Sequence, residues 1–209
     1  MLTPPFSAVI LAGGAAKRLG GGDKPLRMIG GKPILDWIIE RIKPQIHALA
    51  LSANDDPARF AAYSRDILPD FEPHLGPMAG IVSAMEWAKK TNPIASHVLI
   101  LSGDSPFIPS DLVRRLAELP SIAPDSMIAA SSAGRTHPTI GFWPIAASDR
   151  IKQAIIEGKG RRVSDWLAVF PHQSVEWETQ PFDPFFNINT PDDVQKAETI
   201  AALIASHPV

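Results

Sequence analysis

Residues 11–24 read Leu-Ala-Gly-Gly-Ala-Ala-Lys-Arg-Leu-Gly-Gly-Gly-Asp-Lys and continue the apolar run at residues 8–11. Five of the ten residues at 13–22 are glycine, which is more than an ordinary turn needs. Glycine lets backbone N–H groups approach an anion closely. Phosphate charge can be neutralised by the three cations of the stretch, Lys17, Arg18 and Lys24. A buried strand followed by such a loop predicts a site for a nucleoside triphosphate.

Two familiar phosphate loops do not fit this stretch. A Walker A loop needs serine or threonine after its lysine, whereas Pro25 follows Lys24, and the dinucleotide fingerprint G-x-G-x-x-G is absent. A flexible surface loop with solvated cations is the alternative interpretation. The density of glycine and positive charge favours a specialised phosphate-binding loop.

Composition and charge narrow the class of protein. The chain has 209 residues, of which 45% are hydrophobic and 20% charged, and a formal net charge of −2. These values predict one globular domain with no general attraction for nucleic acid or anionic membranes. The chain has no cysteine, which excludes disulfides and thiolate metal sites, and no apolar run approaches the roughly 18 residues of a spanning helix. We expect a soluble cytoplasmic monomer that binds neither nucleic acid nor membrane.

Apolar runs alternate with segments of helical periodicity along the first half. The expected strands lie at 8–11, 48–51, 67–68 and 98–101, and the expected helices at 34–42, 57–63, 78–90 and from Ser110 through Leu119. The second half predicts strands at 127–130, 139–143 and 185–189, and helices at 145–156, 163–170 and 191–205, the last with Thr190 as its N-cap. This rhythm indicates an α/β protein whose mostly parallel sheet is covered on both faces and binds ligands at the carboxyl ends of its strands.

Polar residues follow three of these strands. Asp104 is suited to Mg²⁺, which takes one or two carboxylates together with substrate phosphates; the alternative is an aspartate that shapes a turn. Asn54 can bind a ribose hydroxyl or a base edge, and Asp70 can add a second polar contact, although both residue types are common in turns. The small residues at 76–80 open a helix whose N-terminus can face an anion or simply pack tightly.

The second half offers a further set of polar residues. Asn187 and Asn189 alternate with apolar neighbours, which predicts that both amides point to one face of a strand and into a pocket. Another anionic group could be bound by the scattered cations and histidine of this half, Arg135, His137, Arg161 and Arg162, although paired arginines are commonly solvated.

Six motifs in order resemble those of the MobA-like molybdenum cofactor guanylyltransferase family. They are L-A-G-G-x-x-x-R-x-G-G-x-D-K at 11–24, S-A-N at 52–54, G-P-x-A-G at 76–80, D-x-P at 104–106, H-P-T at 137–139 and N-x-N-T-P-x-D at 187–193. The resemblance implies a Rossmann-like three-layer nucleotidyltransferase fold. It also implies an enzyme that transfers GMP from GTP to molybdenum-molybdopterin, with Mg²⁺ as cofactor and pyrophosphate as product.

The resemblance also implies roles for individual residues. The nucleotide would be bound by Leu11, Ala12, Gly13, Gly14, Arg18, Lys24, Asn54 and Asp70, with Lys24, Arg18 and Asp104 catalytic and Asp104 holding the metal. The pterin side would comprise Gly80, Arg161, Arg162, Asn187 and Asn189. Within a single domain, residues 1–120 would mainly bind nucleotide and Mg²⁺, and residues 121–209 mainly the pterin. Partners would be GTP, molybdenum-molybdopterin, and molybdoenzymes or their chaperones and molybdenum-insertion proteins.

Two departures from the family pattern retain every charged group. The usual C-D-T-P appears as Gly103-Asp104-Ser105-Pro106, and Met78 replaces leucine in G-P-L-A-G. A molybdopterin cytidylyltransferase and a sugar-phosphate nucleotidyltransferase are the nearest rivals, but L-A-G-G favours guanine, because cytidine-using relatives usually read L-A-A-G. A non-catalytic nucleotide-binding delivery protein is a rival of another class. The presence of both Lys24 and Asp104 argues against it.

Overall fold

A seven-stranded sheet forms the centre of the molecule in a computed structural model, which describes residues 6–13, 21–54, 56–72, 75–119, 123–160 and 162–206. The strands are β1 (Ser7–Leu11), β4 (Ala48–Ser52), β5 (Asp66–Leu68), β6 (His97–Ser102), β7 (Met127–Ser132), β8 (Arg135–Pro144) and β9 (His172–Trp177). Their order across the sheet is β5-β4-β1-β6-β8-β7-β9. Within this seven-stranded sheet, every described strand pair is parallel except the two that involve β8. The expected mostly parallel sheet is confirmed.

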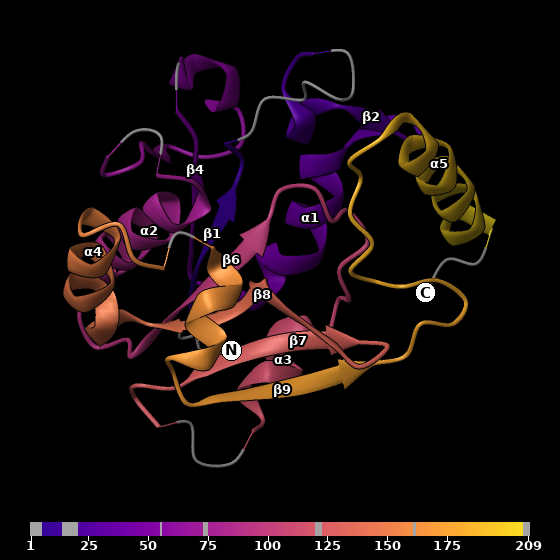
Figure 1. Cartoon of the computed structure of the whole chain (residues 1–209). Helices are drawn as coiled ribbons and strands as arrows, with labels where there is room; N and C mark the ends of the chain where they lie inside the picture. The colour runs from indigo at the N-terminus through magenta and orange to yellow at the C-terminus, as the bar shows by residue number, and fades with distance from the viewer. Residues whose placement is uncertain are drawn as a thin grey trace.

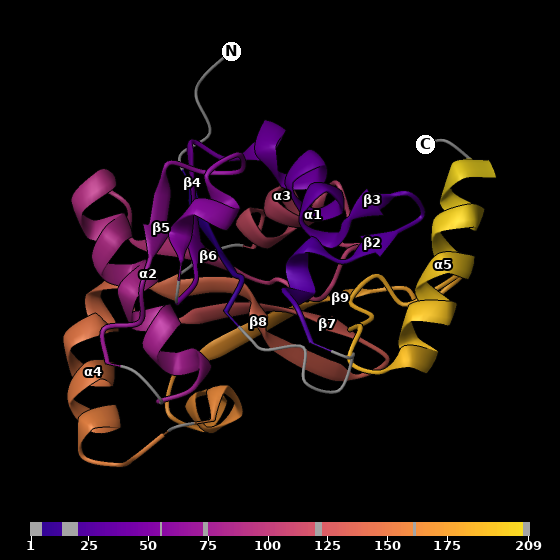
Figure 2. The same cartoon turned by 90° about the horizontal axis from the view of Figure 1, so that it is seen from above.

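Helices cover both faces of this sheet (Figure 1). One face packs against α1 (Ile34–Ile42) and α3 (Leu112–Ala117), and the other against α2 (Pro77–Thr91) and α4 (Ser148–Ile156). The last helix, α5 (Pro191–Ser206), joins the apolar cluster of the first face and packs against β2 (Met28–Ile29). Figure 2 shows the two helix layers on opposite sides of the strands. Successive residues of a strand point to opposite faces, so Ala8 and Ile10 join the first cluster and Val9 joins the second. The expected three-layer α/β fold is confirmed.

Short 3-10 helices occur beside the α-helices, and some of them replace or extend expected α-helices. They are η2 (Lys24–Leu26), η3 (Lys43–Gln45), η4 (Pro57–Phe60), η5 (Ile145–Ala147), which leads into α4, and η6 (Val163–Ala168). The helix expected at 57–63 is therefore one short turn, and the one at 163–170 is not α-helical. In the part of the chain that the structure describes, no helix is both long and apolar enough to cross a membrane.

Other boundaries differ from the expectations. The helix expected to begin at Ser110 and run through Leu119 is α3, with Asp111 at its N-cap position and no side-chain hydrogen bond there. Residues 185–189 do not form a strand. This segment is held instead across the strand ends, because the backbone N–H of Ile188 donates to the carbonyl of Asp104 at 3.0 Å. Strand β9 and the hairpin of β2 (Met28–Ile29) and β3 (Lys32–Pro33) were not predicted.

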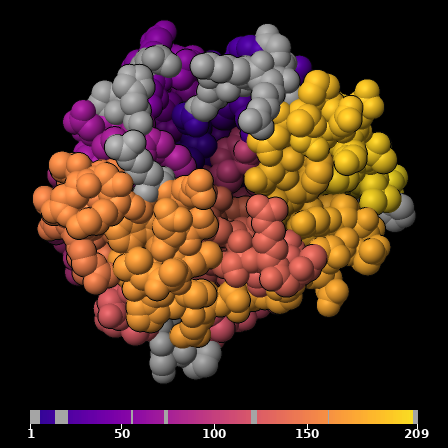
Figure 3. Space-filling model, in the orientation of Figure 1, coloured from indigo at the N-terminus to yellow at the C-terminus, as the bar shows by residue number. Residues whose placement is uncertain are grey.

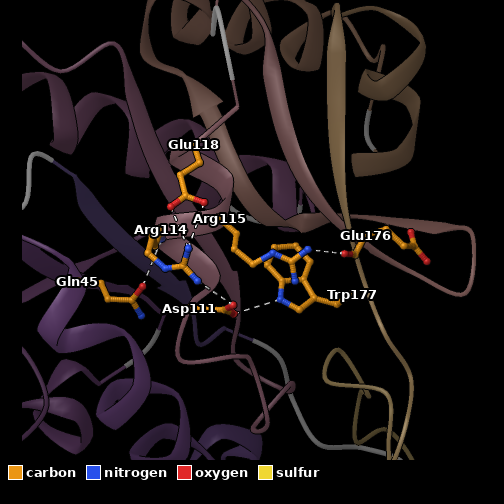
Figure 4. A network of polar contacts seen from close by, with 7 residues as sticks. All are labelled: Gln45, Asp111, Arg114, Arg115, Glu118, Glu176 and Trp177. Atoms are coloured by element: carbon orange, nitrogen blue, oxygen red, sulfur yellow. Dashed lines mark hydrogen bonds and ion pairs between the residues drawn. The ribbon is translucent and has the colours of Figure 1, made fainter.

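A polar network anchors β9 to α3 (Figure 4). The Arg115 guanidinium donates to the carbonyl of Glu176 at 2.9 Å and lies 4.3 Å from the ring centre of Trp177. The indole N–H of Trp177 donates to Asp111 at 3.2 Å. Only Val175 and Trp177 of β9 are apolar, so its sequence lacks a clear strand pattern. The side-chain contacts described above help to hold it at the edge of the sheet.

Candidate active site

A cleft of about 1100 Å³ lies at the carboxyl ends of β1, β4 and β6. In Figure 3 the surface is hollowed between the indigo and purple atoms of the N-terminal half and the orange and yellow atoms of the C-terminal half. The described candidates that line this cleft are Leu11, Ala12, Gly13, Lys24, Asn54, Asp70, Gly80, Asp104 and Asn187. Residues expected on the nucleotide side and on the pterin side thus share one cavity.

Lys24 and Asp104 form an ion pair inside the cleft. The ammonium Nζ of Lys24, at the start of η2, lies 2.6 Å from Oδ2 of Asp104, and the two side chains are 15% and 19% exposed. The other oxygen, Oδ1, accepts a hydrogen bond of 2.6 Å from the hydroxyl of Ser102. The carboxylate is therefore oriented by two donors before any substrate binds.

The two asparagines of the late motif reach this pair. Asn189 Oδ1 accepts a second hydrogen bond from Lys24 Nζ at 2.8 Å. Asn187 Oδ1 accepts one of 2.6 Å from the hydroxyl of Ser105, next to Asp104 in the chain. Although the expected strand is absent, both amides meet residues of the phosphate and metal motifs. In this structure the motif at 187–193 contacts the predicted catalytic residues directly.

Asn54 and Asp70 pair with each other at the other end of the cleft. Asn54 Nδ2 donates to Asp70 Oδ2 at 2.8 Å, and the backbone N–H of Asp70 donates to Asn54 Oδ1 at 3.0 Å. Gly80 must be small here, because a Cβ at this position would lie 2.5 Å from Ser52 Oγ and 3.2 Å from Asp70 Oδ1. Gly80, expected on the pterin side, therefore lies beside the Asn54–Asp70 pair expected on the nucleotide side.

Arg59 is a lining residue that sequence reasoning missed. Its guanidinium donates to the backbone carbonyl of Asn54 at 2.7 Å and lies 3.2 Å from Asp23 Oδ1. It thus connects the end of the glycine-rich stretch to the loop after β4. No motif contains Arg59, so only its position on η4 relative to the cleft could have revealed it. Ser102 and Ser105 were missed too, although they flank Asp104 in the sequence.

Some predicted residues are not brought to the cleft or cannot be placed. Gly14, Arg18 and Arg161 lie outside the described residues, as does Lys17. Arg162 is exposed at the N-cap of η6 and does not line the cavity. Among the described residues no group of three or more His, Asp or Glu side chains could hold a metal ion. A metal at this site would rely on Asp104 and on oxygens of the substrate.

The family is established by comparison with known proteins. A family model described as a MobA-like NTP transferase domain matches residues 8–174, which is most of the chain. The chain belongs to this family. It is 45% identical over 199 residues to the molybdenum cofactor guanylyltransferase of Rhodopseudomonas palustris, covering 95% of each chain. It is 43% identical to the protein of that name from Mesorhizobium japonicum, covering 96% of this chain and 98% of the relative.

Solved structures share the same fold. Molybdopterin-guanine dinucleotide biosynthesis protein A from Archaeoglobus fulgidus matches with a TM-score of 0.72 at 24% identity, over 95% of this chain and all of that one. A 2-C-methyl-D-erythritol 4-phosphate cytidylyltransferase from Thermus thermophilus matches with a TM-score of 0.64 at 19% identity, over 94% and 98% of the two chains. The predicted family and the predicted nucleotidyltransferase class of this MobA-like protein are confirmed.

Proposed function

We propose that this protein transfers GMP from GTP to molybdenum-molybdopterin, giving the molybdopterin guanine dinucleotide and pyrophosphate. The observation that carries the proposal is the Lys24–Asp104 pair in the cleft, joined to Asn189 of the late motif. It occurs in a chain that is 45% identical to a protein named molybdenum cofactor guanylyltransferase. The single domain of residues 1–209 would mainly bind nucleotide and metal through residues 1–120 and the pterin through residues 121–209.

The reaction needs no protein nucleophile. The terminal phosphate of the pterin is already anionic, so one of its oxygens attacks the α-phosphorus of GTP as the bond to the bridging oxygen of the pyrophosphate breaks. Lys24 neutralises phosphate charge on this path, and Arg18 is proposed to do the same. Asn54 and Asp70 are proposed to hold the nucleoside. Catalysis is then positioning together with electrostatic stabilisation of the departing pyrophosphate.

The residues present fit a magnesium ion. Asp104 lines the cleft, is partly exposed, and keeps a free lone pair on each oxygen beyond the bonds from Lys24 and Ser102. Mg²⁺ commonly takes one or two protein carboxylates plus phosphates and water. Bound at Asp104, it would supply positive charge to the phosphates and the leaving group. Because no group of three or more acidic or histidine side chains among the described residues could hold the ion, we expect the metal to bind strongly only together with the nucleotide.

Guanine selectivity is assigned to the backbone at the end of β1. The N–H of Ala12 donates to Ser52 and the carbonyl of Leu11 accepts from Gly103, so these groups are already used. Among the described residues, the carbonyl of Ala12 and the N–H of Gly13 have no such bond, and both residues line the cleft. They offer an acceptor and a donor to the N–H groups and O6 of guanine. A base that mismatches them leaves polar groups unpaired, which typically costs about 1–3 kcal/mol each.

Competition between nucleotides tests the proposal. Equal concentrations of GTP, CTP and ATP are supplied with Mg²⁺ and molybdenum-molybdopterin, and the nucleotide incorporated is identified by mass spectrometry. We expect GMP to be incorporated at least tenfold more than CMP or AMP, in keeping with a discrimination of more than about 1.4 kcal/mol. Incorporation of CMP as well as GMP would point to a cytidylyltransferase. Tight GTP binding without pyrophosphate release would point to a delivery protein.

A further inference from the structure

Strand β8 leaves its pairing register beside the cleft. On β7, Ala129 and Ala130 are consecutive, but their partners on β8 are Gly141 and His137. Residues 138–140 therefore form a bulge with no partner on β7. Bulges re-aim side chains and are frequent next to active sites. Thr139, at the middle of this bulge, lines the cleft.

The bulge is held in one conformation by its surroundings. The indole N–H of Trp143, a fully buried side chain, donates to the carbonyl of Pro138 at 2.9 Å. His137 Nε2 lies 2.8 Å from the hydroxyl of Ser132 on β7. On the far side of Thr139, Ile140 is 1% exposed in the core. The position of Thr139 is therefore fixed by packing and hydrogen bonds on both sides of it.

The hydroxyl of Thr139 is available to a ligand. Its residue is half-buried, and no hydrogen bond to this hydroxyl is found in the described part of the chain. A hydroxyl can donate one hydrogen bond and accept two. Four other polar side chains that line the cleft are engaged with one another, in the Lys24–Asp104 and Asn54–Asp70 pairs. Thr139 thus presents unused hydrogen-bonding capacity to the cavity.

The order of the strands places Thr139 on a definite side of the cleft. Asn54 and Asp70 follow β4 and β5, the glycine-rich stretch follows β1, and Asp104 follows β6. Thr139 lies on β8, the next strand after β6 in the sheet. Beginning at the candidate nucleoside end, the described lining passes Gly13 after β1, then Asp104 after β6, and then Thr139 on β8. The substrate opposite the nucleoside is the acceptor.

We propose that Thr139 binds the terminal phosphate of the acceptor by donating its O–H to a non-bridging phosphate oxygen. This inference rests on the proposed function and extends it to the acceptor side of the site. The hydroxyl keeps its proton throughout, since the phosphate is already an anionic nucleophile. Its contribution is to bind the acceptor with the attacking oxygen in line with the α-phosphorus.

Two substitutions separate the hydroxyl from the shape of the side chain. Thr139→Val keeps the branched shape and removes the O–H, and Thr139→Ser keeps the O–H and removes a methyl group. We expect Thr139→Val to raise the KM for molybdenum-molybdopterin at least tenfold, with the KM for GTP and the melting temperature unchanged. Thr139→Ser should stay within about threefold of wild type. Thr136→Val, on the same strand but away from the cleft lining, is the matched control.

Each other outcome overturns the inference. Unchanged kinetics in Thr139→Val would leave the hydroxyl without a role, and equal losses in Thr139→Ser and Thr139→Val would assign the effect to packing. A larger rise in the KM for GTP than for the acceptor would place Thr139 on the nucleotide side. Wild-type protein is assayed in the same mixture. If it transfers no GMP, the proposed function fails together with the inference; if it does and Thr139→Val matches it, only the inference fails.

Discussion

Lys24 and Asp104 neutralise each other in the free protein while keeping capacity for substrate. The ammonium of Lys24 has three donors, and two are used, on Asp104 and Asn189. The third can reach a phosphate oxygen without breaking the pair. Both side chains line the cleft and are 15% and 19% exposed, so water in the cleft can solvate the charge that remains when either one is removed. These two residues should therefore control turnover far more than folding.

Substitution of Lys24 or Asp104 by alanine is expected to lower GMP transfer by about a hundredfold or more. The physical reason is the loss of one preorganised charge at the reacting phosphates, typically about 3 kcal/mol at the transition state. Pyrophosphate release at saturating substrates measures the effect. Lys32→Ala, which breaks an exposed ion pair with Glu40, is the control and should remain active. Turnover near wild type in either cleft variant would refute the role assigned to that residue.

The hydrogen bonds that cap the start of α5 also fix a residue that contacts the cleft. Thr190 Oγ1 accepts from the N–H of Asp193 at 3.2 Å, and Asp193 Oδ2 accepts from the N–H groups of Asn189 and Thr190, both at 2.9 Å. This reciprocal capping box confirms the expected N-cap. It also fixes the backbone of Asn189, whose side chain holds Lys24. Burial raises the pKa of the Asp193 carboxyl, but these hydrogen bonds outweigh it and leave the pKa below its usual value.

Asp193→Ala is expected to lower the free energy of unfolding by about 1 kcal/mol at pH 7, the typical worth of a cap. The kcat/KM for GMP transfer should fall as well, because Asn189 loses its anchor. Since the folded pKa of Asp193 is lowered, its stabilisation is present above the unfolded value of 3.8 and is lost as pH falls through the folded pKa. Urea titrations and steady-state kinetics measure both effects.

The matched control for this prediction is Asp192→Ala. Asp192 lies in the same first turn of α5 and has no capping bond among the described contacts. The Asp192→Ala substitution should lower the free energy of unfolding by only a few tenths of a kcal/mol, because it removes a negative charge near the positive end of the helix dipole. Equal losses in the two variants would show that charge near the helix terminus, rather than the capping box, is what matters.

At the scale of the whole molecule, the cleft and a buried histidine lie at opposite ends of the sheet. The cleft lies at the carboxyl end of β6, and His97 begins the same strand at the opposite end, with 3% of its surface exposed. Its Nε2 lies 2.9 Å from the carbonyl of Ser126 and its Nδ1 lies 2.8 Å from the hydroxyl of Ser96. Burial lowers the pKa of His97 below the ordinary value of 6.5, although the bond to Ser126 opposes the shift.

His97 should make the fold sensitive to mild acid. Because the folded pKa lies below the unfolded value of 6.5, the unfolded chain binds a proton first as pH falls. The stabilisation from neutral His97 is complete well above pH 6.5 and declines as pH drops toward the folded pKa. Urea unfolding at pH 8 and pH 5.5 is expected to show a smaller decline in His97→Gln than in wild type. Parallel declines in the two proteins would exclude His97 as the sensitive group.

Prediction from sequence succeeded where local pattern and tertiary structure agree. The buried strands β1, β4 and β6 are nearly continuous apolar runs, and α1 repeats its isoleucines at helical spacing. Prediction failed for β9, whose mostly polar sequence lacks the apolar pattern of a strand. It forms a strand by pairing in parallel with β7, and Arg115 and Trp177 attach it to α3. The opposite error occurred at residues 185–189, whose alternating sequence predicts a strand. Hydrogen bonds between this segment and both Asp104 and Ser105 hold it in a non-strand conformation instead.

The sequence by itself determined the three-layer fold, the family and the main groups of the candidate site, because glycine density, strand-end carboxylates and motif order are local properties of the chain. The tertiary structure decided which of these groups meet. It brought Asn189 to Lys24 across 165 positions, tied Arg59 to the glycine-rich stretch, and turned Thr139 into the cleft through a bulge. Such contacts depend on the order of strands in the sheet and on the packing of segments distant in the chain, and no local pattern encodes either.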